Sequence, residues 1–149
     1  MNKIVRTDAS NLEFQKLVSL LDRELAERDG PDNIFYSQYN FIEGIKYAVV
    51  LYHKMLPAGC GAIKSFDENS MEIKRMFVIP KMRGNQMGTS ILSALENWAF
   101  ELGYGRCVLE TGKRQPEAIR LYLKNGYKII PNYGQYQGIE NSVCFEKLL

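Results

Sequence analysis

The residues with the clearest chemical potential lie in a glycine-containing turn between a strand-like segment and a helix-like one. Gly84 and Gly88 fall within segment 78–90, which leads into an amphipathic pattern. N–H groups in the first turn of a helix have no intrahelical acceptor and favour phosphate, and glycine lets a ligand approach the main chain closely. Four cations lie nearby with no acidic residue between them: Lys74, Arg75, Lys81 and Arg83. The turn is a candidate phosphate site, and a structural turn with a solvated basic face is the alternative.

Two familiar phosphate loops do not match this spacing. The P-loop places four residues between its glycines and a Lys directly after the second one, whereas three residues separate Gly84 from Gly88 and Thr89 follows. The dinucleotide fingerprint Gly-x-Gly-x-x-Gly is also absent from the sequence.

Regular elements on both sides must hold this turn in place. Runs of β-branched and aromatic residues before it predict strands over 46–53, 60–66 and 71–79, with turns at 57–59 and 67–70. Apolar residues three and four apart after it predict a helix that ends at Gly103. The remaining pattern predicts a strand over 106–111, a helix from Pro116 to Asn125-Gly126, and strands over 127–130 and 142–147.

The first part of the chain adds a strand, a helix and an aromatic stretch. Residues 3–7 predict a strand, and leucines at helical spacing from Leu12 to Leu25 predict a helix that Asp8 or Ser10 caps. Asp29-Gly30-Pro31 ends this helix, and the aromatic stretch 33–41 predicts a loop with a helical turn. The complete order predicts an α/β fold, with a mixed sheet of about six to seven strands flanked by helices.

Composition places the chain among globular proteins. Hydrophobic residues make up 46% and charged residues 24% of 149 residues, so we expect a single folded domain over 1–149. The longest apolar run, 47–52, is far shorter than the ~20 residues of a membrane span, and the N-terminus lacks a secretory pattern. Three dispersed cysteines, Cys60, Cys107 and Cys144, fit neither a disulfide framework nor a zinc site. We therefore expect a cytoplasmic protein with no metal and no membrane partner.

The charge is unevenly distributed along the chain. Residues 1–70 carry two more acidic than basic residues, and residues 71–149 carry four more basic than acidic ones. A mildly basic half suits an anionic ligand. A net charge of +2 is too small to predict nucleic-acid binding.

Two segments together resemble the GNAT N-acetyltransferase superfamily. The first is strand, Pro80, Arg83-Gly84-x-x-x-Gly88 and then an amphipathic helix, which is similar to the acyl-CoA site of that family. The second, segment 110–127, resembles the family pattern Asn-x-x-Ala-x-x-Leu-Tyr-x-x-x-Gly-Phe. Gln86 stands where the family usually has a second glycine, and Gln115 stands where it usually has Asn. The resemblance covers roughly residues 3 to 147.

The resemblance implies a GNAT-like acyl-CoA N-acyltransferase fold with a splayed central pair of parallel strands, and acetyl-CoA as co-substrate. The diphosphate is expected on the backbone of residues 83–90, and the pantetheine along the strand that ends at Val78. The implied cofactor-binding residues are Met76, Phe77, Val78, Arg83, Gly84, Asn85, Gln86, Met87, Gly88, Thr89, Ser90, Thr111, Gln115 and Tyr122.

Acetyl transfer to an amine needs a neutral amine and a proton for the departing thiolate. Tyr122 falls on the general-acid tyrosine of the family, and a tyrosine packed in the core is the alternative. Glu72 falls on the glutamate that some members use as a base acting through water, and a strand glutamate paired with Lys74 is the alternative. Glu110, at the head of the following strand, is the reserve base.

The acceptor side of the site is less distinctive. In the family, the region after the first helix and the loop between the last two strands shape the acceptor site. This implies Asp29, Asp32, Tyr36, Tyr39 and Tyr133, with a small cationic or lysine-like amine as the acceptor. Ordinary loop packing and solvated acids are the alternative.

The sequence predicts an acetyl-CoA-dependent N-acetyltransferase that acts by direct transfer in a ternary complex. A non-catalytic acyl-CoA-binding module of the same fold is the main alternative, and a nucleic-acid-binding protein of this fold is a third. Acyl chain length stays open, and a homodimer is one oligomeric state compatible with the sequence.

Overall fold

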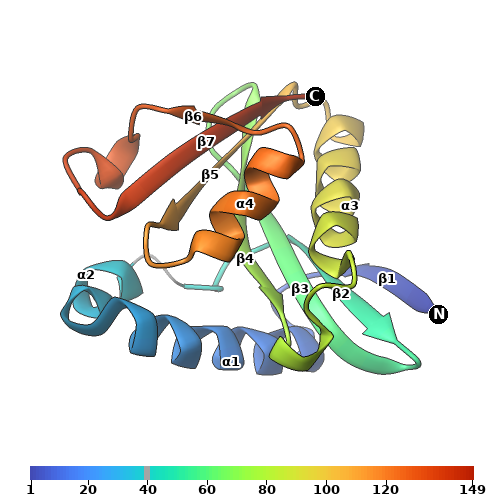
Figure 1. Cartoon of the computed structure of the whole chain (residues 1–149). Coiled ribbons are helices and arrows are strands. Elements are labelled where there is room, and N and C mark those ends of the chain that lie inside the picture. Colours follow the sequence, from blue (N-terminus) through green and yellow to red (C-terminus); the bar gives the residue numbers. More distant parts are fainter. Residues whose placement is uncertain (39–40) are drawn as a thin grey trace.

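A computed structural model describes residues 1–38 and 41–149 of the chain (Figure 1). Its centre is a seven-stranded mixed sheet in the order β1-β2-β3-β4-β5-β7-β6. The strands are β1 (Asn2–Thr7), β2 (Tyr47–His53), β3 (Leu56–Ser65), β4 (Ser70–Val78), β5 (Arg106–Gly112), β6 (Lys128–Ile130) and β7 (Ser142–Leu148). The helices are α1 (Leu12–Asp29), α2 (Asn33–Ser37), α3 (Met87–Glu101) and α4 (Pro116–Lys124). This confirms the predicted α/β class and the mixed sheet.

Helices cover both faces of the sheet. The residues of β2 show this, because they pack alternately against α3 and against α1. Val49 and Leu51 lie in one buried cluster with Ile91 and Leu95 of α3. The residues that alternate with them, Ala48 and Val50, lie in a second cluster with α1. Because successive strand residues point to opposite faces, a strand that is apolar throughout is one that is covered on both sides. Cys107 and Cys144 are fully buried, as their apolar neighbours predict.

The cap of α1 differs from the prediction. Asn11, directly before the helix, accepts a 2.9 Å hydrogen bond from the Phe14 N–H. Asp8 instead accepts hydrogen bonds from the backbone and hydroxyl of Ser10 and so closes a turn ahead of the helix. Neither Asp8 nor Ser10 is the cap, because each serves this earlier turn.

The turn between β2 and β3 also differs from the prediction. It consists of Lys54 and Met55, both at positive φ, and His53 pairs with Leu56. This is the geometry of a two-residue hairpin turn, which usually carries Asn or Gly. Residues 57–59 lie within β3, and Pro57 is accommodated because the register shifts between Leu51 and Tyr52.

The parallel strands β4 and β5 pair over a short stretch and then separate. Only the pairs Ser70–Arg106, Met71–Cys107 and Glu72–Val108 join them in the described part of the chain, and the strands diverge beyond that point (Figure 1). This is the splayed pair that the family resemblance implies. We call this junction the seam.

A bulge in β4 lies next to the seam. Cys60 pairs with Phe77 and Ala62 with Lys74, so β4 carries one extra residue there, and Arg75 adopts a φ of +59°. The Arg75 side chain is buried and forms an ion pair with Asp22 of α1. A bulge re-aims the strand that carries it, and here it turns the second half of β4 away from β5.

Candidate functional site

Two adjoining pockets lie where β4 and β5 separate. The larger, which we call the α3 pocket, has a volume of about 440 Å³ and is bounded by the end of β4, the start of α3 and α4. The smaller, which we call the seam pocket, has a volume of about 120 Å³ and lies among α1, β4, β5 and α4. Both pockets share the residues Leu21, Met76, Gln115, Ala118 and Tyr122. They therefore form one site with two compartments.

The glycine turn forms one wall of the α3 pocket and opens a helix N-terminus onto it. Gln86 precedes the helix with φ +65° and ψ +12°, a left-handed conformation that favours glycine. This explains why the family usually has glycine at the position of Gln86. The first helical hydrogen bond runs from Ser90 N–H to the Gln86 carbonyl at 3.0 Å, so the N–H groups of Met87 to Thr89 precede it and have no acceptor within the helix. The turn thus presents backbone donors to an anion.

The positive charge around the α3 pocket comes partly from residues that sequence reasoning missed. Arg120 and Lys124, four residues apart on α4, line the pocket together with Arg83. Arg83 is held in place by a 2.8 Å hydrogen bond to the Val78 carbonyl and by a 2.9 Å ion pair with Glu24. The other predicted cations lie elsewhere, because Lys74 lines the seam pocket, Arg75 pairs with Asp22, and Lys81 is exposed.

Most of the predicted cofactor residues meet in the α3 pocket. Its lining includes Met76, Phe77, Val78, Arg83, Gly84, Gln86, Met87, Gly88, Thr89, Gln115 and Tyr122. Thr111 lines the seam pocket instead. The side chains of Asn85 and Ser90 are turned back to the carbonyls of Met82 and Gln86, respectively, and neither residue lines the α3 pocket or the seam pocket.

Tyr122 lies on the wall between the two compartments. Its ring packs against Tyr127 and Phe145, and the residue is 6% exposed. Its hydroxyl has no hydrogen-bond partner among residues 1–38 and 41–149. Burial, reinforced by the nearby Glu110, raises the pKa of the Tyr122 hydroxyl above its usual value, so it carries its proton at neutral pH. Its proton is therefore not committed to any acceptor among the residues that the structure describes.

Glu72 lines the seam pocket but is already engaged. The Tyr133 hydroxyl donates a 2.7 Å hydrogen bond to Glu72 Oε2, and Lys74 Nζ lies 3.7 Å from Oε1. The predicted pairing with Lys74 is therefore present in the structure, alongside a tyrosine that the sequence did not connect to Glu72.

Glu110 is the less engaged of the two glutamates in the seam pocket. Its Oε2 is buried and has no hydrogen-bond partner in the described part of the chain. Burial raises the pKa of Glu110 to about 7, and a hydrogen bond from Ser142 and the charge of Lys74 offset part of the effect. A carboxyl group with a pKa near neutrality can take up and release a proton under physiological conditions.

The predicted acceptor residues are distributed unevenly around the seam pocket. Asp29 and Tyr36 line it, whereas Asp32 lies outside it and pairs with Arg114 at 2.9 Å. Tyr133 reaches the site through its bond to Glu72. Tyr39 lies outside the described residues.

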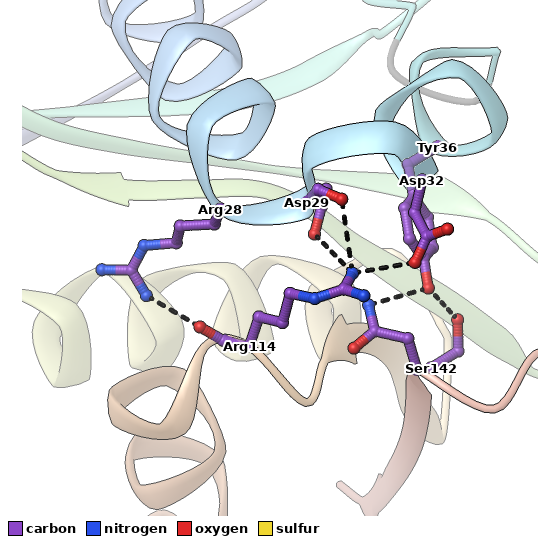
Figure 2. A network of polar contacts seen from close by, with 7 residues as sticks. Arg28, Asp29, Asp32, Tyr36, Arg114 and Ser142 are labelled. Carbon is purple, nitrogen blue, oxygen red and sulfur yellow. Dashed lines mark hydrogen bonds and ion pairs between the residues drawn. The ribbon is translucent and has the colours of Figure 1, made fainter.

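Two arginines cross between the end of α1 and the loop that precedes α4 (Figure 2). Arg114 donates to the Asp29 carbonyl at 3.5 Å and pairs with Asp32, while Arg28 donates to the Arg114 carbonyl at 3.4 Å and pairs with Glu117. Beside them, the Tyr36 hydroxyl lies 2.9 Å from Ser142 Oγ. The contacts of the two arginines join segments about 85 residues apart in sequence, and they fix one wall of the seam pocket.

Residues 1–38 and 41–149 contain no cluster of three His, Cys, Asp or Glu side chains that could hold a metal ion. None of the helices in this part of the chain combines the length and apolar character of a membrane span.

Comparison with known proteins identifies related sequences. A family model described as "Acetyltransferase (GNAT) family" matches residues 14–127. An IAA acetyltransferase of Azospirillum brasilense is 40% identical over 92 residues, which cover 61% of this chain and 60% of that protein. An aminoalkylphosphonate N-acetyltransferase of Salmonella typhimurium is 37% identical over 57 residues, or 38% of this chain and 37% of that protein. The chain thus matches less than two thirds of the length of these relatives.

Solved structures extend the similarity to the whole fold. A protein from Klebsiella pneumoniae assigned as an acyl-CoA N-acyltransferase superimposes with a TM-score of 0.84 and 30% identity, over 100% of this chain and 98% of that one. The PaiA N-acetyltransferase of Thermoplasma acidophilum, solved with coenzyme A, shares the fold with a TM-score of 0.71 and 17% identity, over 100% of this chain and 99% of that one.

Proposed function

The chain belongs to the GNAT acetyltransferase family, and from this premise we propose that it transfers the acetyl group of acetyl-CoA directly to a primary amine bound in the same complex. The observation that carries the proposal is the position of Tyr122. Its free, protonated hydroxyl lies on the wall shared by a pocket suited to a phosphate-bearing ligand and a pocket that contains a glutamate of near-neutral pKa.

The residues of the α3 pocket suit coenzyme A. The open N-terminus of α3 supplies backbone donors for the diphosphate, and Arg120 and Lys124 add positive charge. The edge of β4 beyond the seam, at residues 76–78, is not paired with β5 and can bond to the amides of the pantetheine arm in the manner of an added strand. Acetyl-CoA would supply an activated acetyl group, and the chain would supply the positioning and the proton transfers.

The seam pocket contains the groups that the transfer requires. Glu110 would accept a proton from the ammonium group of the acceptor and leave a neutral amine. The amine nitrogen then forms the N–C bond as the C–S bond breaks, and Tyr122 would give its proton to the departing sulfur. The proton that the nitrogen loses as it becomes an amide would return to the Tyr122 oxygen, and Glu110 would release its own proton to solvent. The free Oε2 and raised pKa of Glu110 support this residue as the base, in preference to Glu72, which Tyr133 and Lys74 already engage.

A turnover screen tests the proposal. Acetyl-CoA is incubated with the protein and with polyamines, amino acids, amino sugars, aminoalkylphosphonates and peptides, and released thiol and product mass are both measured. We expect amine-dependent thiol release with a product one acetyl group heavier. Coenzyme A binding without turnover of any amine would instead support the non-catalytic acyl-CoA-binding module.

A further inference from the structure

The seam pocket contains a second carboxylate that the transfer reaction does not use. Asp29, at the end of α1, is 4% exposed, and its Oδ1 is buried without a hydrogen-bond partner in the described residues. The nearest cation, Arg114, lies 4.0 Å from Oδ1, which is beyond hydrogen-bond distance. A buried polar atom without a partner is unfavourable, so a ligand that donates to Asp29 gains a bond that the free protein lacks.

The remaining charges in this pocket are only partly matched, because Arg75 Nε is a buried donor that also lacks an acceptor in the described residues. Lys74 lies next to Glu72, and Arg75 is paired with Asp22, which does not line the pocket. Glu110 and Asp29 are the acids whose buried oxygens lack a donor. The lining of the pocket therefore holds three acids, Asp29, Glu72 and Glu110, against two cations, Lys74 and Arg75. Arg114 does not line the pocket and adds positive charge 4.0 Å from Asp29 Oδ1.

The positions of Tyr122 and Asp29 indicate how an acceptor would be oriented in the site. Tyr122 lines both compartments, whereas Asp29 lines only the seam pocket. An amine that reacts beside Tyr122 and extends into the seam pocket would bring its far end to Asp29. A group that donates hydrogen bonds and carries positive charge matches that end of the pocket.

We propose that the acceptor is a short diamine, with one amino group at Tyr122 and Glu110 and a second ammonium group bound by Asp29. The inference rests on the proposed amine transfer and adds the substrate class. An acceptor that ends in a carboxylate would place another negative charge among Asp29, Glu72 and Glu110. An acceptor with an apolar end would leave Asp29 Oδ1 without a donor.

Three acceptors with four-carbon chains test the proposal: putrescine, n-butylamine and 4-aminobutyrate. We expect kcat/KM for putrescine to exceed that for n-butylamine by at least about tenfold, with 4-aminobutyrate lowest. Asp29→Asn should reduce the ratio of putrescine to n-butylamine toward one. Glu27→Gln makes the same change of charge at an exposed position of the same helix and should leave the ratio as in the parent.

A second variant guards against loss of folding in Asp29→Asn. Arg114→Gln removes the cation nearest to Asp29 and should lower the KM for putrescine without lowering that for n-butylamine. A merely structural role of the Arg114 contacts would instead shift both KM values in the same direction. A parent ratio near one, or a ratio that Asp29→Asn does not change, overturns the diamine proposal while amine transfer stands. If no amine of the wider screen is acetylated, both proposals fail.

Discussion

The Tyr133 hydroxyl donates a 2.7 Å hydrogen bond to Glu72 Oε2, so a residue of the loop before β7 occupies the carboxylate that the sequence favoured as the base. Glu110, one strand further along the sheet, retains a buried oxygen without a donor. The two acids therefore have different environments within one pocket. This difference leads to the first prediction.

The pH dependence of turnover should identify the base. Because the pKa of Glu110 is about 7 and a base must be deprotonated, kcat/KM of the parent should rise with pH through about 7. Glu110→Gln should lose that inflection and about 10²- to 10⁴-fold in activity at neutral pH, with partial recovery at high pH, where more of the amine is already neutral. Glu72→Gln should keep the inflection. If Glu72→Gln abolishes it and Glu110→Gln does not, Glu72 is the base, as the sequence predicted.

The same carboxyl group should also affect stability. The pKa of Glu110 is higher in the folded state, about 7, than its usual value of 4.5, so the folded state holds the proton more tightly and stability falls as pH rises between these values. Glu110→Gln should lack this loss. We therefore compare the free energies of unfolding of variant and parent in urea at pH 5 and at pH 8. The value for Glu110→Gln minus that for the parent should be larger at pH 8 than at pH 5, by more than ~1 kcal/mol. An unchanged difference would show that Glu110 titrates alike in both states.

Removal of the Tyr122 hydroxyl should separate catalysis from binding. Tyr122→Phe deletes the proposed acid but keeps the ring between Tyr127 and Phe145, so kcat should fall by about 10²- to 10⁴-fold with little change in coenzyme A affinity. Tyr104→Phe, whose exposed hydroxyl lies beside Ser65, is the matched control and should retain activity. A loss of less than about threefold in Tyr122→Phe would leave Tyr122 as a packing residue.

A side chain at Gly88 should obstruct the α3 pocket. Gly88 lines that pocket, and a Cβ built on it would lie 3.2 Å from Leu121 Cδ2. Coenzyme A should raise the melting temperature of the parent by binding the native state, and Gly88→Val should reduce or abolish this increase. Ser93→Val introduces the same residue at an exposed position of α3 and should keep it. An equal thermal shift in Gly88→Val would remove the turn from the binding site.

The left-handed conformation of Gln86 should make glycine the more stable residue there. A non-glycine residue at φ +65° is disfavoured by roughly 1–2 kcal/mol. Glycine avoids this cost, but it loses more conformational entropy on folding, which offsets about half of the gain. Gln86→Gly should thus increase the free energy of unfolding by about 0.5–1 kcal/mol. Asn85→Gly, at a neighbouring residue without a positive φ, should decrease it. If both substitutions are destabilising, the strain at Gln86 is relieved elsewhere.

Local patterns in the sequence predicted most of the elements, because period and turn chemistry act over a few residues. The leucines of α1, the apolar strands and the glycine turn before α3 all gave correct elements. The exceptions were also local. Asp8 and Asn11 are both good caps, and the sequence does not show which one a preceding turn uses. Lys54-Met55 forms a tight turn without the residues that usually mark one.

The site was less visible in the sequence, because its chemistry depends on contacts between distant segments. Glu72 is hydrogen-bonded only because the Tyr133 loop folds over it. Glu110 Oε2 is unpaired because no donor among the described residues lies within hydrogen-bond distance of it. Arg114 meets Asp29 and Asp32 only after β5 and α1 have come together. No spacing rule predicts such pairs. In contrast, Arg120 and Lys124 are four residues apart, and this spacing on a helix predicts a basic face.

The short seam also bears on how the chain folds. Strands β2, β3 and β4 follow one another through tight turns, so their pairing closes small loops, whereas β5 reaches β4 only after the whole of α3 is in place. Contacts that close long loops form late, because the chain loses entropy before the contacts compensate for it. We expect the hairpins to form early and the three-pair junction to close last. Because both pockets lie across that junction, competence to bind a ligand would be the final property acquired during folding.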